Sequence, residues 1–182
     1  MIEIMGPLQS LLFKIDHEGL WQKEFNLKRN EFLTIQDRID TNLYLILEGT
    51  LCIYIMDNDV KQIVRFGYRG DLITALDCFL SDKPTLFNIQ TLKKTHLKVL
   101  SRSSFLEFVN SDNEVKDTWT QVLQSFVHQQ IEREFDLLTS SPMKRYQRVL
   151  KRSPKLFQEI PHKYIASYLR MAPETLSRIK KR

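Results

Sequence analysis

The chain has 182 residues, enough for a domain of ordinary size with a smaller appendage. A hydrophobic content of 42% with 27% charged residues excludes a disordered chain, and the lack of a run of about 18 apolar residues excludes a membrane-spanning helix. The first seven residues, Met1 to Pro7, have neither the basic nor the apolar stretch of a signal peptide, so we expect a cytoplasmic protein.

Metal-binding and enzymatic motifs are missing from the sequence. Cys52 and Cys78 are 26 residues apart and have no CxxC companion, which excludes a recognisable zinc or iron–sulfur site and favours buried thiols. The histidines are scattered singly, at His17, His96, His128 and His162. The chain has no GxSxG, HExxH or glycine-rich phosphate-binding motif. We therefore expect no catalytic residues, no metal ligands and no cofactor.

Charge divides the chain into two parts. Residues 139–182 hold twelve basic and two acidic residues, a net charge of +10, which leaves −5 for residues 1–138. Lysine and arginine displace counterions from phosphate backbones, so a basic C-terminal part attached to an acidic body points to a polyanionic partner.

Strand patterns occupy residues 24–99. Residues 43–55 contain two apolar, β-branched runs on either side of Glu48-Gly49, a pattern that predicts a hairpin. Further strand-like runs follow at residues 61–66, 87–92 and 96–100. No long helical pattern separates these runs, so we expect an α+β fold in which residues 1–111 form an antiparallel, jelly-roll-like β-roll.

Two helices are predicted after the last strand: a short one at residues 101–109, within the roll domain, and a long one at residues 112–138, which contain neither glycine nor proline. The long helix has two apolar faces, about 130° apart at 100° per residue. One face holds Val115, Trp119, Val122 and Phe126, and the other holds Leu123, Val127, Ile131, Phe135 and Leu138. Each apolar face must be buried against another surface. We expect one face to pack against the roll and the other against the same helix of a second subunit. We assign the first face to the dimer; a single wide core stripe in a monomer is the alternative.

Residues 139–182 have the pattern of a helical DNA-binding domain. Ser141 is a suitable N-cap and Pro142 a suitable first residue for a helix that ends near Arg152. Residues 160–182 then have the spacing of a helix-turn-helix, with Ala166 at the crossing, where close approach needs a small residue. The apolar contacts between its two helices come from Ile165, Leu169, Leu176 and Ile179.

The turn of this motif needs a residue with a positive φ angle, and the position is taken by Arg170. A residue other than glycine in the left-handed region costs on the order of 1 kcal/mol, which a packed motif tolerates. Pro173 suits the first turn of the second helix, because its φ angle is preset and it needs no N–H there. We expect a helix-turn-helix without a recognisable wing.

Three polar residues, Glu174, Thr175 and Arg178, fall in the half of the second helix that enters a major groove. Arginine can bond bidentately to guanine, and glutamate can accept a hydrogen bond from cytosine. The basic residues farther along the helix are expected near phosphates; they are Lys180, Lys181 and Arg182.

The whole chain resembles the CRP/FNR superfamily of bacterial transcription regulators. The resemblance rests on Tyr44-Leu45-Ile46-Leu47-Glu48-Gly49, on Gly70-Asp71-Leu72, and on Ile165-Ala166 followed by the segment from Pro173 to Ile179. It implies a cyclic-nucleotide-binding-type roll, a dimerisation helix over residues 112–138 and a C-terminal helix-turn-helix. It also implies that Glu174 and Arg178 read bases while Thr175 and Lys181 contact the DNA backbone.

The ligand pocket of this family is only partly present in the sequence. In relatives that bind cyclic AMP, a Gly-Glu-Leu segment supports the ribose, and an arginine after a proline pairs with the phosphate. Here the corresponding residues are Gly70-Asp71-Leu72 and, after Pro84, Thr85. Because a buried phosphate needs charge-assisted hydrogen bonds, we expect the roll to bind a different small effector or none.

The main hypothesis is therefore a homodimeric regulator that binds double-stranded DNA at a pseudo-palindromic site, with RNA polymerase and a small-molecule effector as further partners and no membrane association. One alternative is a ligand sensor that acts through protein contacts and carries a vestigial helix-turn-helix. Another is a roll that binds a cyclic nucleotide after all.

Overall fold

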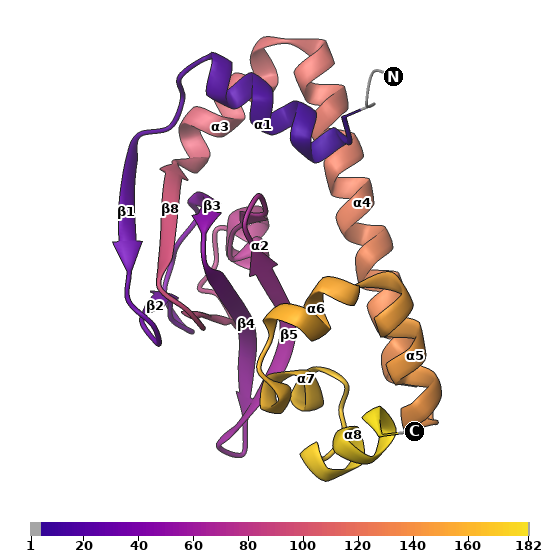
Figure 1. Cartoon of the computed structure of the whole chain (residues 1–182). Coiled ribbons are helices and arrows are strands. Elements are labelled where there is room, and N and C mark those ends of the chain that lie inside the picture. The colour runs from indigo at the N-terminus through magenta and orange to yellow at the C-terminus, as the bar shows by residue number, and fades with distance from the viewer. Residues whose placement is uncertain (1–4, 182) are drawn as a thin grey trace. The chain divides into compact units, whose positions relative to one another are not determined.

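Figure 1 shows a computed structural model of the chain, which describes residues 5–181. Residues 1–4, part of the segment in which we expect no signal peptide, and Arg182, which we expect near phosphates, lie outside the described residues. Among residues 5–181, no helix has both the length and the apolar character needed to cross a membrane.

Within the described chain the strands form two antiparallel sheets of four strands each. One sheet has the order β1-β8-β3-β6, made of Lys23–Leu27, Thr95–Leu100, Leu43–Glu48 and Leu72–Ile73. The other has the order β2-β7-β4-β5, made of Phe32–Thr34, Asn88–Thr91, Thr50–Asp57 and Val60–Tyr68. Buried residues of both sheets share one core, including Ile46 and Leu97 from the first sheet and Leu51 and Ile89 from the second. The predicted antiparallel β-roll is confirmed.

The predicted hairpin at residues 43–55 is wrong. Strand β3 pairs with β8 and β6, whereas β4 pairs with β7 and β5, so the two runs belong to different sheets. Gly49 forms a corner between them with a φ angle of +99°, and a Cβ atom there would come within 2.5 Å of the Lys94 carbonyl oxygen. The break between the runs is a single corner, which turns the chain into the facing sheet instead of folding β4 back onto β3.

The helices that surround the roll are α1, Pro7–His17; α2, Leu76–Ser81; and α3, Arg102–Ser111. The Ser101 hydroxyl caps α3 by accepting a hydrogen bond from the Ser104 amide at 3.3 Å. The long helix α4, Asn113–Leu138, begins one residue from its predicted start and ends at its predicted last residue.

The first apolar face of α4 packs inside its own chain. Val115, Trp119 and Val122 are buried, and the Trp119 ring meets the Phe105 ring edge-on at 4.9 Å between centroids and the Phe79 ring at 6.2 Å. Phe126 is half-buried. The assignment of Val115, Trp119 and Val122 to a dimer is therefore corrected, because side chains buried within the single chain are not available to a second subunit. For Phe126 the assignment remains a prediction.

Replacing Trp119 with alanine tests this packing. Removing a buried aromatic side chain from a well-packed core costs about 3–5 kcal/mol, so Trp119→Ala should lower the free energy of unfolding by that amount in urea titrations. Thr118→Ala is the matched control one residue away, because among residues 5–181 the side chain of Thr118 bonds to the Glu114 carbonyl of its own helix alone. A Trp119→Ala variant as stable as the control would contradict the packing described.

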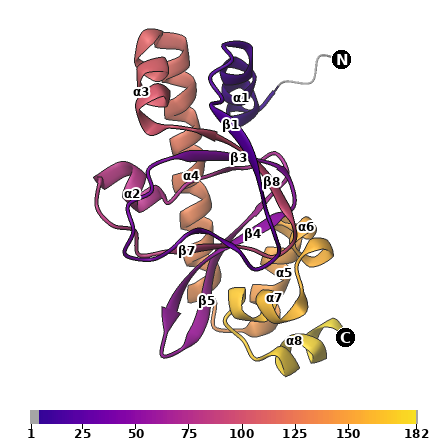
Figure 2. The same ribbon diagram turned by 90° about the vertical axis from the view of Figure 1, so that its left-hand side faces the viewer.

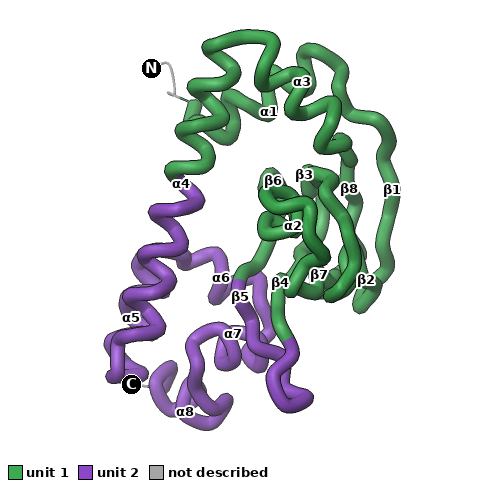
Figure 3. Tube along the Cα trace, turned by 180° about the vertical axis from the view of Figure 1, so that it is seen from behind, with its two compact units in different colours: residues 1–55, 65–124 green, residues 56–64, 125–182 purple. Residues whose placement is uncertain are grey.

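The chain divides into two compact units, coloured separately in Figure 3. The first comprises residues 1–55 and 65–124, and the second comprises residues 56–64 and 125–182. The second unit therefore combines the C-terminal half of α4 with α5, Pro142–Arg152; α6, Pro154–Glu159; α7, His162–Tyr168; and α8, Pro173–Lys180. It also takes the tip of the β4–β5 hairpin, residues 56–64, from a distant part of the sequence. The predicted domain boundaries, at residues 111 and 138, remain a prediction.

Candidate nucleic-acid interface

Helices α7 and α8 form a helix-turn-helix and lie side by side (Figure 2). Ile165, Leu169 and Leu176 are buried between the elements of this motif, and Ile179 is half-buried. Ala166 is also buried, which agrees with the need for a small side chain at the crossing. Pro173 occupies the first turn of α8, as predicted.

Arg170 has a φ angle of +51°, so the prediction of a left-handed residue at the turn is confirmed. The turn closes by hydrogen bonds from the Met171 amide to the Ala166 carbonyl and from the Arg170 amide to the Ser167 carbonyl, each 3.1 Å long. These bonds satisfy carbonyl groups that the end of α7 would otherwise leave unpaired. The turn between α7 and α8 therefore combines a left-handed residue with two backbone hydrogen bonds.

The residues predicted to contact DNA share one face of α8. Glu174, Arg178 and Lys181 are exposed and follow one another at intervals of four and three residues, which places them on the same side of the helix. Thr175 is half-buried beside them. Within residues 5–181, the side chains of Glu174, Arg178 and Lys181 make no hydrogen bond or ion pair. This face can therefore engage an external partner without breaking internal contacts.

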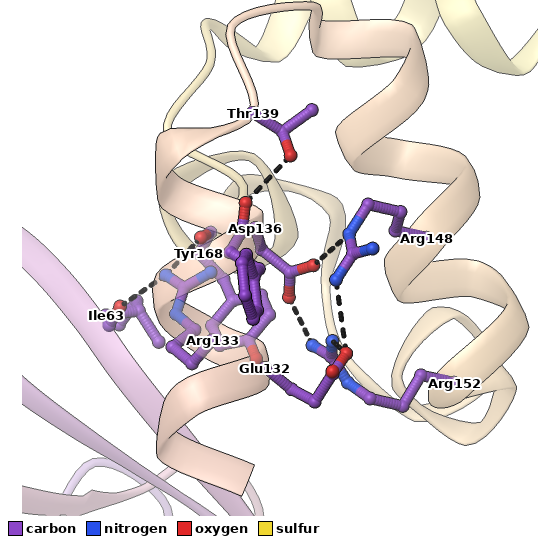
Figure 4. A network of polar contacts seen from close by, with 9 residues as sticks. Ile63, Glu132, Arg133, Asp136, Thr139, Arg148, Arg152 and Tyr168 are labelled. Carbon is purple, nitrogen blue, oxygen red and sulfur yellow. Dashed lines mark hydrogen bonds and ion pairs between the residues drawn. The ribbon is translucent and has the colours of Figure 1, made fainter. Parts of the chain in front are cut away.

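A network of ion pairs attaches α5 to α4 (Figure 4). The Asp136 carboxylate is fully buried and accepts hydrogen bonds from Arg152 and, at 3.1 Å, from the Arg148 Nε. Glu132 pairs with the same two arginines, at 3.1 Å and 3.4 Å. Burial alone lowers the pKa of Arg152, but the hydrogen bonds and charges of Asp136 and Tyr168 together outweigh it and raise this pKa. Two of the twelve basic residues of the C-terminal part thus hold the unit together.

A groove of about 550 Å³ lies between the C-terminal half of α4 and α5. It is lined by His128, Gln129 and Glu132 of α4 and by Arg148, Lys151 and Arg152 of α5. Since Glu132 neutralises part of the charge of both arginines, the groove is less basic than the residue types along α5 indicate.

The predicted ligand residues of the roll bond to other groups of the roll itself. The Asp71 carboxylate accepts a hydrogen bond from the Tyr68 amide at 2.9 Å, Gly70 turns with a φ angle of +88°, and Leu72 is buried. Thr85 is fully buried, and its hydroxyl donates to the Asp77 carboxylate at 2.8 Å.

Asp77 is a residue of this region that the sequence motifs miss. Its second carboxylate oxygen accepts a hydrogen bond from the Leu86 amide at 2.8 Å. The negatively charged Asp77 carboxylate thus accepts from both the Thr85 hydroxyl and the Leu86 amide. The sequence signal for Asp77 is weak, since it consists of an aspartate in the first turn of a six-residue helix, eight residues before Thr85.

Comparison with known proteins agrees with this architecture. The model of the cyclic nucleotide-binding domain family matches residues 24–112. The potassium channel AKT1 of Arabidopsis thaliana is 26% identical over 107 residues, which are 59% of this chain and only 12% of the channel.

Solved structures extend the likeness beyond the roll. A CooA mutant from Carboxydothermus hydrogenoformans superposes with a TM-score of 0.74 at 14% identity, covering 100% of this chain and 85% of that one. The global regulator CLP of Xanthomonas campestris, described as responsive to c-di-GMP, gives a TM-score of 0.69 at 10% identity over 93% of this chain and 90% of that one. Residues 24–112 are therefore similar to the cyclic nucleotide-binding domain, and the chain shares the fold of these two solved structures.

Proposed function

We propose that this chain is a transcription regulator that binds a specific DNA sequence through α8. The observation that carries the proposal is the open face of Glu174, Arg178 and Lys181 on the second helix of a helix-turn-helix. An arginine and a glutamate one turn apart match the donor and acceptor pattern of a G·C-containing major groove. The net charge of +10 over residues 139–182 supplies attraction to phosphates.

The proposed regulator is a homodimer that uses the second apolar face of α4. Four large apolar side chains of this face are exposed in the single chain: Val127 at 60%, Ile131 at 47%, Phe135 at 55% and Leu138 at 74%. They follow one another at intervals of four, four and three residues and therefore form one stripe. A stripe of this kind on a long helix suits the same stripe of a second copy around a two-fold axis. Two copies then present two α8 helices to a pseudo-palindromic site.

The roll of this regulator is proposed not to bind cyclic AMP. A phosphate placed near Thr85 would meet the Asp77 carboxylate instead of a positive charge, and Asp77 already takes the hydroxyl and amide donors there. Like charges in a partly buried site repel, and the missing charge-assisted hydrogen bonds are worth about 1.5–3 kcal/mol each. The effector, if the roll has one, must suit a site with a negative charge.

A thermal-shift titration checks this expectation. A ligand that binds only the folded state at 100 times its Kd stabilises it by about 2.7 kcal/mol, which raises the melting temperature of a chain of this size by several degrees. We expect no rise with cyclic AMP at about 1 mM, the same result as with the control nucleotide 5′-AMP. A rise that grows with cyclic AMP and is absent with 5′-AMP would show that the roll binds the cyclic nucleotide.

Selection of binding sites from random duplexes tests the proposal as a whole. A dimeric regulator should enrich two half-sites about one helical turn apart, and its affinity should fall steeply as salt rises. No binding at low salt would refute the proposal and favour a sensor that acts through protein contacts.

A further inference from the structure

The tip of the β4–β5 hairpin, residues 56–64, belongs to the same compact unit as the helix-turn-helix (Figure 3). The Ser167 side chain in the last turn of α7 makes two bonds to the backbone of β5. Its hydroxyl donates to the Lys61 carbonyl at 2.7 Å and accepts from the Ile63 amide at 3.3 Å. One serine thus satisfies a donor and an acceptor of a strand, as a neighbouring strand would.

Arg133, on α4, adds a second connection between the hairpin and the helix-turn-helix (Figure 4). Its side chain is only 6% exposed, and its Nη2 donates to the Tyr168 carbonyl and lies 3.5 Å from the Ile63 carbonyl oxygen. The guanidinium carbon also lies 3.7 Å from the centre of the Tyr168 ring. Burial lowers the pKa of Arg133, yet an arginine keeps its proton in proteins, so a positive charge is held at this junction.

All these contacts converge on the turn of the helix-turn-helix. Ser167 and Tyr168 end α7, and Arg170, the left-handed residue, donates to the Gln62 side chain. The contacts avoid the exposed reading face of α8, which holds Glu174 and Arg178. The hairpin therefore holds the segment that fixes the direction of α8 and leaves the DNA-reading face open.

We propose that Arg133 and Ser167 are positioning residues that attach the hairpin to the turn, so that residues 56–64 help to orient α8 for DNA binding. This inference rests on the DNA-binding function proposed above. The hairpin holds the left-handed turn in one geometry and so keeps α8 at the angle that places Arg178 against a base. Loosening the hairpin should reduce discrimination between sequences more than it reduces attraction to phosphates, because phosphate contacts tolerate small changes of angle.

The test compares four variants of the full chain. Ser167→Ala removes the hydroxyl, Ser167→Thr retains it, and Arg133→Met removes the guanidinium while retaining most of the side-chain length. Ser153→Ala is the matched control, because Ser153 is half-buried in the same unit and its side chain makes no capping bond. Circular dichroism establishes that each variant is folded; should Arg133→Met fail to fold, the three serine variants still decide the outcome.

Two measurements are made on each variant. Hydrogen exchange of the Ile63 amide in the free protein should accelerate at least about tenfold in Ser167→Ala and Arg133→Met and remain at the wild-type rate in Ser167→Thr and Ser153→Ala. The ratio of affinities for the selected and a random duplex should fall about fivefold or more in the same two variants, with less than about a twofold change on random DNA.

The outcomes separate this inference from the function on which it rests. Unchanged exchange in Ser167→Ala would show that the hairpin is not held as proposed. Faster exchange with an unchanged affinity ratio would show that the hairpin is attached but does not position α8. A wild-type chain with no preference for any duplex would instead refute the proposed DNA-binding function, and the positioning role with it.

Discussion

Arg178→Ala is expected to lose most of the preference for the selected duplex. Truncating an arginine that bonds bidentately to guanine costs about 1–3 kcal/mol, which is about 5- to 150-fold in affinity for the specific site. Affinity for random DNA should change little, because Arg178 is expected to read a base. Fluorescence anisotropy titrations with both duplexes measure the two affinities.

Lys181→Ala provides the contrast with Arg178→Ala. A lysine that pairs with a phosphate should weaken binding to both duplexes alike and reduce the slope of log affinity against log salt by about 1. Lys116→Ala, which removes an exposed charge from the first unit, controls for the change in net charge. If Arg178→Ala and Lys181→Ala lost equal affinity on selected and random DNA, the assignment of reading and phosphate-binding roles would be wrong.

Ile131→Glu is expected to dissociate the dimer. In the proposed dimer this side chain lies in the stripe shared by two α4 helices, and the two-fold axis places the two new carboxylates of the pair close together. Burying charges without partners costs several kcal/mol, more than enough to shift a micromolar dimer to monomer. Light scattering after size-exclusion chromatography gives the mass directly, and affinity for the palindromic site should fall in parallel.

Gln130→Glu is the matched control for this change. It introduces the same charge one residue away, on an exposed position about 100° around the helix from Ile131. This control should remain dimeric. A dimeric Ile131→Glu variant, or a wild-type chain of monomeric mass, would refute the interface.

Local rules predicted the features that local interactions determine. Arg170 adopts the left-handed conformation that the turn between α7 and α8 needs, and the spacing of Ile165, Leu169 and Leu176 around it is enough to predict this. Ser141 caps α5 with a hydrogen bond from the Lys144 amide, as its position before Pro142 predicts.

The errors arise where the partner of a residue is distant in the sequence. Periodicity reveals two apolar faces on α4 but does not reveal which of them the chain itself buries. Phe79 and Phe105 pack against Trp119 of the first face, whereas Ile131 of the second face is exposed. Gly49 marks a break between two strands without revealing that the chain changes sheet there, since that depends on the close approach of Lys94.

The residues of the site that no motif indicates depend on tertiary contacts in the same way. Asp77 bonds to Thr85 eight residues later, and Ser167 bonds to Lys61 more than a hundred residues earlier. Neither pair has a local pattern, because a serine or an aspartate at such a position is also what an ordinary helix end contains.

The hairpin at residues 56–64 limits which fragments and chimeras of this protein retain the contacts of the second unit. The chain passes from one compact unit to the other after residues 55, 64 and 124, so a single cut in α4 does not separate the two units. A fragment that starts at residue 125 would contain Arg133 and Ser167 without the strand to which they bond. A chimera that receives this helix-turn-helix therefore needs the tip of the hairpin as well.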